Sequence, residues 1–171
     1  MKKLILFVVV VFTICLWTRT HARPPANSDS GFEAFLAHWE EAQSRFINGD
    51  PTLWKQNARH GDEATIFGAF GGHEKGWTEV GPRYDWASSQ FRENGAEIKV
   101  EYLNSGVSGD LAFTVAIEHQ ENVRLGNQDK PAPRALRVTQ IFQKEEGAWK
   151  LLHRHADPLI EKKAPSTPSQ K

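Results

Sequence analysis

Two histidines placed two residues apart are the first candidates for chemistry in this sequence. His153 and His155 lie in a strand-type segment, where residues two apart point to the same side of a sheet, so both can face one space. Histidine titrates near neutral pH and therefore suits general acid–base catalysis. A hydrogen-bonded structural pair is an alternative interpretation. A metal site is a third, but a third ligand is not evident, so we expect no metal and no cofactor.

Arg137 and Glu118 form a second candidate pair. Both lie in segments with strand-like composition, and these segments follow each other along the chain. A guanidinium buried inside a sheet needs a partner, because an unpaired buried charge is costly, and Glu118 is the natural one. The two side chains can form a simple structural ion pair. Alternatively, the planar guanidinium can bind the carboxylate of a ligand.

Helices must precede these strands in the chain. Apolar residues at helical spacing, with a capping box formed by Ser30 and Glu33, predict a first helix that ends at Gly49. Asp50 and Pro51 predict the start of a second, short helix. A third helix is expected over about 82–93.

Alternating residues in the second half predict strands. The expected strands are 98–102, 111–123, 134–144 and 148–156, preceded by a short one over 64–67. Short connections between the long strands imply an antiparallel meander. Helices followed by such a sheet indicate an α+β fold, with three N-terminal helices covering one face of a curved, cone-shaped, antiparallel-rich sheet.

The first 22 residues have the three-part pattern of a secretory signal peptide. A basic start at Lys2 and Lys3 precedes an apolar run over 4–17, and Thr-His-Ala at 20–22 offers small residues for cleavage. The apolar run is short for a bilayer span, although an uncleaved anchor is the alternative. We therefore expect a protein exported to the periplasm or outside the cell, with no membrane attachment after cleavage of 1–22.

The mature chain is expected to have three parts. These are a flexible spacer over 23–30, one domain over 31–158 and a disordered tail over 159–171. Loss of Lys2, Lys3 and Arg19 with the signal leaves 18 Lys and Arg against 21 Asp and Glu, a net charge of −3. The mature chain then has no basic stripe, so we expect no nucleic acid as a partner. The single cysteine is also removed, which excludes a thiol nucleophile.

Several stretches resemble one known family. Residues 137–142 (Arg-Val-Thr-Gln-Ile-Phe) and 147–157 resemble the C-terminal signature of SnoaL-like domains, and 46–50 (Phe-Ile-Asn-Gly-Asp) resembles their junction between the first two helices. These domains belong to the nuclear transport factor 2-like superfamily, with ketosteroid isomerase, polyketide cyclases and the association domain of calcium/calmodulin-dependent kinase II. The resemblance covers roughly 31–158. It implies a cystatin-like cone, but the same fold hosts both enzymes and assembly domains.

The resemblance also suggests which residues face the pocket. It implies that Arg137 and His155 point inward, together with Thr139, His153 and Glu118. Asp62 falls near the position of a catalytic carboxylate in ketosteroid isomerase. Further candidates for the pocket are His60 and three tryptophans: Trp54, Trp77 and Trp86. A solvated loop pair of His60 and Asp62 is the alternative interpretation.

Two functions remain open at this point. The first is binding of a small, largely apolar ligand with an acidic or carbonyl group, and Arg137 would orient this ligand. If the protein is an enzyme, His155 would transfer a proton in an isomerase-, cyclase- or hydrolase-type reaction. The second is a non-catalytic assembly domain that forms a homodimer through the outer face of the sheet. In that case Leu136, Val138 and Phe142, opposite Arg137, are the expected contact residues.

Overall fold

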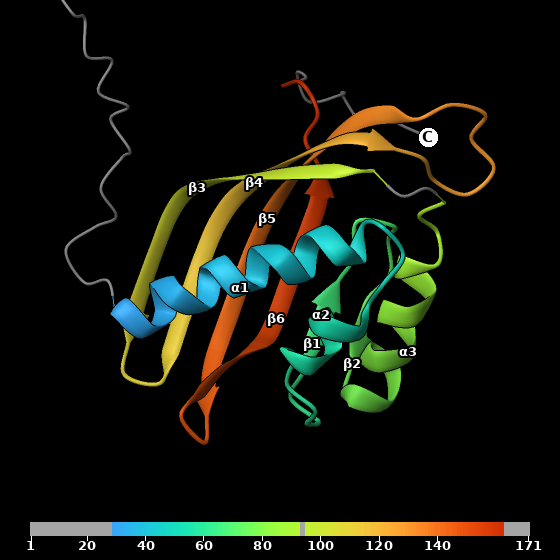
Figure 1. Ribbon diagram of the computed structural model, residues 1–171. Coiled ribbons are helices and arrows are strands. Elements are labelled where there is room, and N and C mark those ends of the chain that lie inside the picture. Colours follow the sequence, from blue (N-terminus) through green and yellow to red (C-terminus); the bar gives the residue numbers. More distant parts are fainter. Residues whose placement is uncertain (1–28, 93–94, 163–171) are drawn as a thin grey trace, which may run out of the picture.

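The computed structural model describes residues 29–92 and 95–162 (Figure 1). The expected signal peptide over 1–22, most of the expected spacer and the end of the expected tail lie outside the described residues. Across the described ranges, no helix is long and apolar enough to cross a membrane.

The N-cap of helix α1 (Ser30–Phe46) lies one residue earlier than expected. Asp29, not Ser30, is the N-cap, and its Oδ1 accepts a hydrogen bond of 2.8 Å from the backbone N–H of Gly31. The helix buries one apolar face that includes Phe32, Trp39 and Phe46. The chain then turns through Gly49, whose φ of +90° explains the glycine expected at this end.

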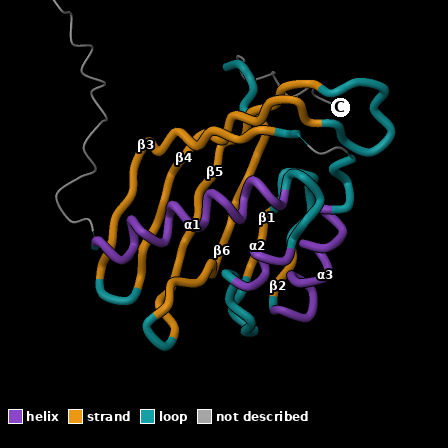
Figure 2. Tube along the Cα trace, viewed as in Figure 1, coloured by secondary structure: helices purple, strands orange, loops and turns teal. Residues whose placement is uncertain are grey.

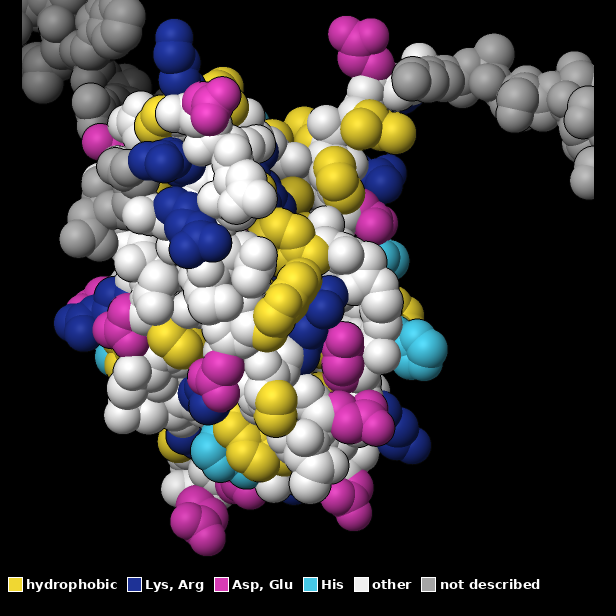
Figure 3. Space-filling view, turned by 90° about the vertical axis from the view of Figure 1, so that its right-hand side faces the viewer, with side chains coloured by type: hydrophobic (Ala, Val, Ile, Leu, Met, Phe, Trp, Pro, Cys, Tyr) yellow, Lys and Arg dark blue, Asp and Glu magenta, His cyan; other side chains and the backbone are white. Residues whose placement is uncertain are grey.

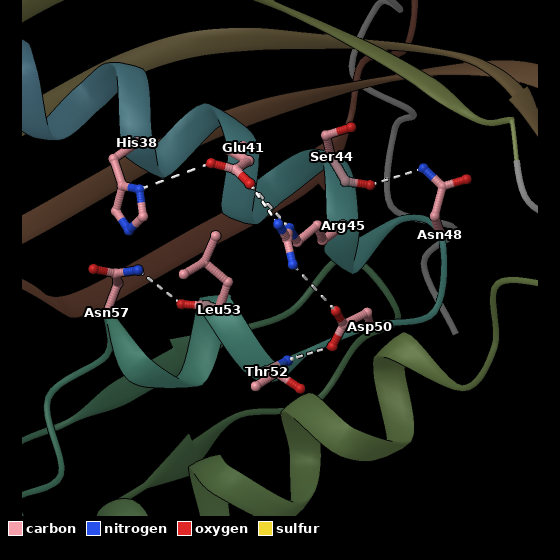
Figure 4. A network of polar contacts seen from close by, with 9 residues as sticks. All are labelled: His38, Glu41, Ser44, Arg45, Asn48, Asp50, Thr52, Leu53 and Asn57. Carbon is pink, nitrogen blue, oxygen red and sulfur yellow. Dashed lines mark hydrogen bonds and ion pairs between the residues drawn. The ribbon is translucent and has the colours of Figure 1, made fainter.

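A polar network holds the corner between α1 and α2 (Thr52–Gln56), as Figure 4 shows. Arg45 Nη2 donates to Glu41 Oε1 at 2.7 Å, and Arg45 Nη1 lies 4.0 Å from Asp50 Oδ2. Asp50 Oδ1 accepts from the Thr52 N–H at 2.9 Å, but the N-cap is Pro51 and the helix starts at Thr52, so the expected cap at Asp50 lies one residue too early. The corner fixes the direction in which α2 crosses α1.

Helix α3 (Trp77–Ser88) starts and ends earlier than expected. Gly76, with a φ of +77°, precedes it, and its carbonyl accepts the first helical hydrogen bonds from Glu79 and Val80. Pro82 therefore lies inside the helix rather than at its start. This shift places Arg83 and Tyr84 in the middle of α3.

In the described part of the chain, six strands form one curved sheet in the order β2-β1-β6-β5-β4-β3. The long strands β3 (Glu97–Ser108), β4 (Leu111–Val123), β5 (Ala132–Glu145) and β6 (Ala148–Pro158) make an antiparallel meander. The short strand β1 (Thr65–Phe67) pairs parallel with β6 and antiparallel with β2 (Glu74–Lys75). The helices lie on the concave face (Figures 1 and 2), which confirms the expected α+β fold.

One extra residue in β6 decides which side chains face the helices. Ile141 pairs with His153 but Phe142 pairs with Leu151, so Leu152 is a bulge. Leu151 points inward before the bulge, and Arg154 and Ala156 point inward after it. The expected strand over 148–156 therefore contains a break in its alternation, and both histidines of β6 point outward.

Aromatic side chains fill the core between α1, α2 and the sheet. The ring centroid of Trp54 lies 4.4 Å from that of Trp39 and 4.5 Å from that of Phe46. Phe142 and Trp149 complete the cluster against α1. This packing closes one half of the concave face and leaves the half near α3 hollow.

Candidate functional site

A narrow cavity, in which the centre of a water-sized sphere can occupy about 60 Å³, lies between the helices and the concave face of the sheet. That is room for a few water molecules or one small ligand. Most of its wall is apolar. The larger apolar side chains on the wall are those of Phe46, Ile47, Trp54, Tyr84, Phe91 and Leu136. The cavity can therefore hold a largely apolar molecule.

The floor of the cavity is a buried ion pair between Glu118 of β4 and Arg154 of β6. Arg154 Nη1 donates to Glu118 Oε1 and Nη2 to Oε2, both at 2.8 Å. Gln43 Nε2 donates to Oε1 at 2.6 Å, and Gln120 Nε2 lies 3.5 Å from Oε2. All four residues are buried. Both carboxylate oxygens are thus already occupied by protein donors.

A second guanidinium lines the same cavity without a carboxylate. Arg134 of β5 has its guanidinium 5.4 Å from the ring centroid of Phe70, and within the described ranges it makes no ion pair or hydrogen bond. Burial lowers the pKa of Arg134, nearby Glu118 opposes this effect, and Arg154 adds to it. An arginine remains charged at neutral pH despite such a shift. Among the described residues, Arg134 therefore has no ion-pair partner of its own, because the nearby Glu118 carboxylate is bound by Arg154.

The mouth of the cavity is formed by α3 and the loop after β1. Arg83 Nη2 donates to the Gly71 carbonyl at 2.6 Å, and its Nε lies 3.5 Å from Glu74 Oε1. Trp86 stacks against Arg83 and meets the Phe70 ring edge-on at 5.6 Å. On the side of the molecule that carries α3, apolar side chains gather beside Lys and Arg side chains (Figure 3). The mouth combines apolar surface with positive charge.

Tyr84 of α3 is a residue of the cavity wall. Burial raises the pKa of Tyr84 to about 12, with a smaller opposing effect from Trp54. The hydroxyl therefore keeps its proton at neutral pH and can donate a hydrogen bond.

Glu118 and Trp54 line the cavity as expected, but Arg137 does not. The Arg137 side chain is 57% exposed on the outer face, and its Nη2 lies 3.5 Å from Asp157 Oδ2. The reason is strand parity, because the neighbours of Arg137 in β5, Leu136 and Val138, are the buried ones. The expected partnership of Arg137 with Glu118 is wrong, and Arg154 is the partner.

The outer face brings three of the expected residues together, away from the cavity. Arg137, Thr139 and His155 border an open groove with Val115 and Leu103. Thr139 pairs directly with His155 across β5 and β6. Their expected placement in the pocket is wrong, because the bulge at Leu152 and the parity of β5 turn them to the other side of the sheet.

The two histidines of β6 have separate partners. His155 Nε2 lies 3.1 Å from Asp157 Oδ2, and its side chain is 47% exposed. His153 Nδ1 is 2.8 Å from the Thr65 hydroxyl. Burial, and to a smaller extent His155, lower the pKa of His153. Neither ring borders the cavity, so neither can transfer a proton to a ligand bound there.

The remaining candidates also lie outside the cavity wall. The His60 ring stacks on that of Trp77 at 3.8 Å, and its Nε2 is 2.9 Å from the Lys55 carbonyl oxygen. Asp62 is exposed in the turn before β1, and Trp86 lies at the mouth. Over residues 29–92 and 95–162, no group of three side chains is placed to hold a metal ion.

Sequence reasoning missed the polar residues that do face the cavity, namely Gln43, Gln120, Arg134 and Arg154. Helical spacing offered a signal for Gln43, because it follows Trp39 by four residues and precedes Phe46 by three. The adjacent apolar pair Leu151-Leu152 was a signal for a break in the alternation that would turn Arg154 inward.

Comparison with protein families gives one match. Residues 54–161 match the family model described as a SnoaL-like domain. None of the curated proteins compared with the chain matched it.

Solved structures show the same fold at low sequence identity. A nuclear transport factor 2-like superfamily protein from Salmonella enterica is 17% identical, with a TM-score of 0.61 over 80% of this chain and 94% of that one. A protein provisionally assigned as a ketosteroid isomerase from Shewanella frigidimarina is 20% identical, with a TM-score of 0.56 over 75% of this chain and 96% of that one. The association domain of calcium/calmodulin-dependent kinase II from C. elegans is 14% identical, with a TM-score of 0.55 over 74% and 94%.

The family match covers more than half of the chain, and the cone of helices and curved sheet agrees with these structures. The chain belongs to the SnoaL-like domain family.

Proposed function

We propose that this protein binds a small, largely apolar carboxylate in the cavity between α3 and the concave face of the sheet. The observation that carries this proposal is the Arg134 guanidinium, which lines an apolar cavity and forms no ion pair with any described carboxylate, because Glu118 is bound by Arg154. A buried or half-buried cation without a partner is unfavourable, and a ligand carboxylate removes that cost.

The charges around the cavity support this assignment. Three guanidinium groups of the described residues line the cavity, and two of them have partners, because Arg154 pairs with Glu118 and Arg83 lies beside Glu74. Arg134 is the third. Arginine also suits carboxylate recognition through its planar fork of donors. The aromatic wall would bury the rest of the ligand.

The same arrangement favours binding over proton transfer. A general base must have a free acceptor atom within reach of the ligand. Glu118 is the one carboxylate among the described residues of the cavity wall, and Arg154 and Gln43 already occupy its oxygens. Tyr84 can donate a hydrogen bond to a ligand carbonyl, but its raised pKa makes it a poor base. We therefore propose a binding domain.

Matched pairs of probes test the carboxylate requirement. Hexanoate and benzoate should bind, and their amides should bind at least about tenfold more weakly, since an ion pair with hydrogen bonds contributes more than a neutral contact. Arg134→Gln should remove the difference between acid and amide. Arg137→Gln is the matched control, because it removes the same charge from the outer face. Equal binding of acids and amides to the wild-type protein, measured by calorimetry, would refute the proposal.

The outer face of the sheet supports a second candidate function, self-association. Leu136, Val138 and Phe142, the residues expected from the sequence to form a contact face, are instead buried in the interior, so that assignment is wrong. The outer face has other apolar residues: Leu103, Leu111 and Phe113 are 59%, 48% and 38% exposed. One of the similar structures is named an association domain. Light scattering at micromolar concentration should show a homodimer, and a strict monomer would exclude it.

We also propose that the protein is exported. The support is the basic start, apolar run and small residues over 1–22. Mass spectrometry of the protein from its native host should find a chain that begins near Arg23. An intact Met1 would show that residues 1–22 are retained.

A further inference from the structure

Two buried glutamines on the cavity floor present carbonyl oxygens without hydrogen-bond donors. Gln43 and Gln120 are 1% and 3% exposed, and both line the cavity. Within the described part of the chain, the Oε1 atom of each has no hydrogen-bond partner. A buried acceptor without a donor costs free energy, so these two oxygens need an explanation.

Glu118 fixes the orientation of both amides. Gln43 Nε2 lies 2.6 Å from one carboxylate oxygen and Gln120 Nε2 lies 3.5 Å from the other. Rotating either amide by half a turn would place a carbonyl oxygen against a carboxylate oxygen, which brings two acceptors together. The carbonyl oxygens must therefore point away from Glu118, and the bidentate bond from Arg154 keeps Glu118 in place.

The position of Gln120 relates these acceptors to the proposed carboxylate site. Gln120 in β4 and Arg134 in β5 are directly paired across the two strands. Side chains at paired positions on one face of a sheet are close neighbours. A ligand carboxylate at Arg134 would therefore have its adjacent carbon next to Gln120.

We propose that the ligand is a 2-hydroxy carboxylic acid with an apolar tail. Its carboxylate binds Arg134, its hydroxyl donates to the carbonyl oxygen of Gln120 or Gln43, and its tail lies along the aromatic wall. This inference rests on the proposed carboxylate site and adds a second requirement, a hydrogen-bond donor beside the carboxylate.

Positional isomers test the added requirement in the wild-type protein. 2-Hydroxyhexanoate should bind about tenfold more tightly than hexanoate, because it satisfies a buried acceptor. 6-Hydroxyhexanoate, which has the same composition with the hydroxyl at the far end, should bind no better than hexanoate. Isothermal titration calorimetry of the three compounds gives these ratios.

A matched pair of variants locates the effect. Gln120→Met should abolish the preference for 2-hydroxyhexanoate over hexanoate and retain the preference for hexanoate over hexanamide. Gln140→Met removes an equally buried glutamine that does not line the cavity, so it should keep both preferences.

The outcomes separate the two proposals. Equal binding of 2-hydroxyhexanoate and hexanoate, with hexanamide still weaker, would overturn the hydroxy-acid inference and leave the carboxylate site in place. Failure of hexanoate to bind better than hexanamide would overturn the carboxylate site itself. A preference for the hydroxyl that survives in Gln120→Met and is lost in Gln43→Met would assign the hydroxyl to Gln43, within the same inference.

Discussion

Arg154 of β6 forms a bidentate ion pair with Glu118 of β4 across the intervening strand β5, with each Nη atom 2.8 Å from one carboxylate oxygen. The two side chains are 8% and 2% exposed, and the Arg154 guanidinium also lies 5.2 Å from the centroid of the Trp54 ring. The pair therefore joins β4, β6 and α2 at one buried point. The ion pair also neutralises the charge on the cavity floor. Arg134 is then the guanidinium that has no ion-pair partner among the described residues of the cavity wall.

Removing one member of this pair should be strongly destabilising. Arg154→Met leaves Glu118 as a buried charge without its partner, which typically costs about 3–5 kcal/mol in the free energy of unfolding. Arg137→Gln is the control, because its pair with Asp157 is about half exposed and contributes below about 1 kcal/mol. Urea denaturation measures both values.

The double variant Glu118→Leu/Arg154→Met separates buried-charge cost from packing. It leaves no buried charge, so it should be more stable than Arg154→Met alone. A single variant that loses no more stability than Arg137→Gln would show that solvent reaches Glu118 in the folded protein.

The burial of Tyr84 should make the protein sensitive to alkali. Because its pKa is raised to about 12 in the folded state, above about 10 in the unfolded chain, its contribution is intact below pH 10 and is lost as pH rises toward 12. The loss is on the order of 2 kcal/mol. Tyr84→Phe should flatten the fall in unfolding free energy over this pH range.

Ultraviolet absorbance of tyrosinate gives an independent measurement. The sequence has two tyrosines, and burial also raises the pKa of Tyr102. Neither should ionise near pH 10 in the folded protein, and the tyrosinate signal should appear together with unfolding. A tyrosinate signal near pH 10 from the folded Tyr102→Phe variant would contradict the buried position of Tyr84.

Regular spacing made the fold predictable, whereas one irregular residue made the site unpredictable. Helical and strand periods in the sequence correspond directly to α1 and to the four long strands, because burial of one face requires those periods. The faces of β6 depend on the bulge at Leu152, and a shift by one residue exchanges every inward and outward side chain. The sequence therefore pointed to His155 where the structure has Arg154.

The parity of β5 could not be assigned for a different reason. Arg134 and Arg137 lie three residues apart and so face opposite sides of the strand, and both sides contain apolar residues. Only the packing of α3 and α1 against one face shows that Arg134 is inside. The inward orientation of Glu118 on β4 agreed with expectation, because small residues alternate with it along that strand.

Acid should destabilise the protein through His153. Burial, and then repulsion from His155, hold its pKa below the ordinary value of about 6.5. A depressed pKa means that the folded state prefers the neutral ring, so this contribution is present above about pH 6.5 and is lost as pH falls through the folded pKa. His153→Gln should reduce the loss of unfolding free energy between pH 7.5 and 5.

The matched control is His38→Gln on α1, whose side chain is 48% exposed. That variant removes a histidine on another element and should leave the contribution of His153 in place. His155→Gln should reduce the acid sensitivity only in part, because burial is the larger cause of the shift at His153. Identical acid sensitivity of His153→Gln and the wild-type protein would contradict the assigned cause.

Leu103 is the most informative position for testing association through the outer face. It is 59% exposed and borders the groove that also contains Val115 and Ile117. A second copy placed on this face would bury Leu103, so Leu103→Glu would place a charge in an apolar contact and should convert the expected dimer to monomer.

Trp86→Glu is the control, because it makes a similar change on α3, at 45% exposure, away from this face. Sedimentation at several protein concentrations distinguishes the variants. If Trp86→Glu dissociated the dimer and Leu103→Glu did not, the contact would have to lie at the mouth of the cavity, and association would then compete with ligand entry.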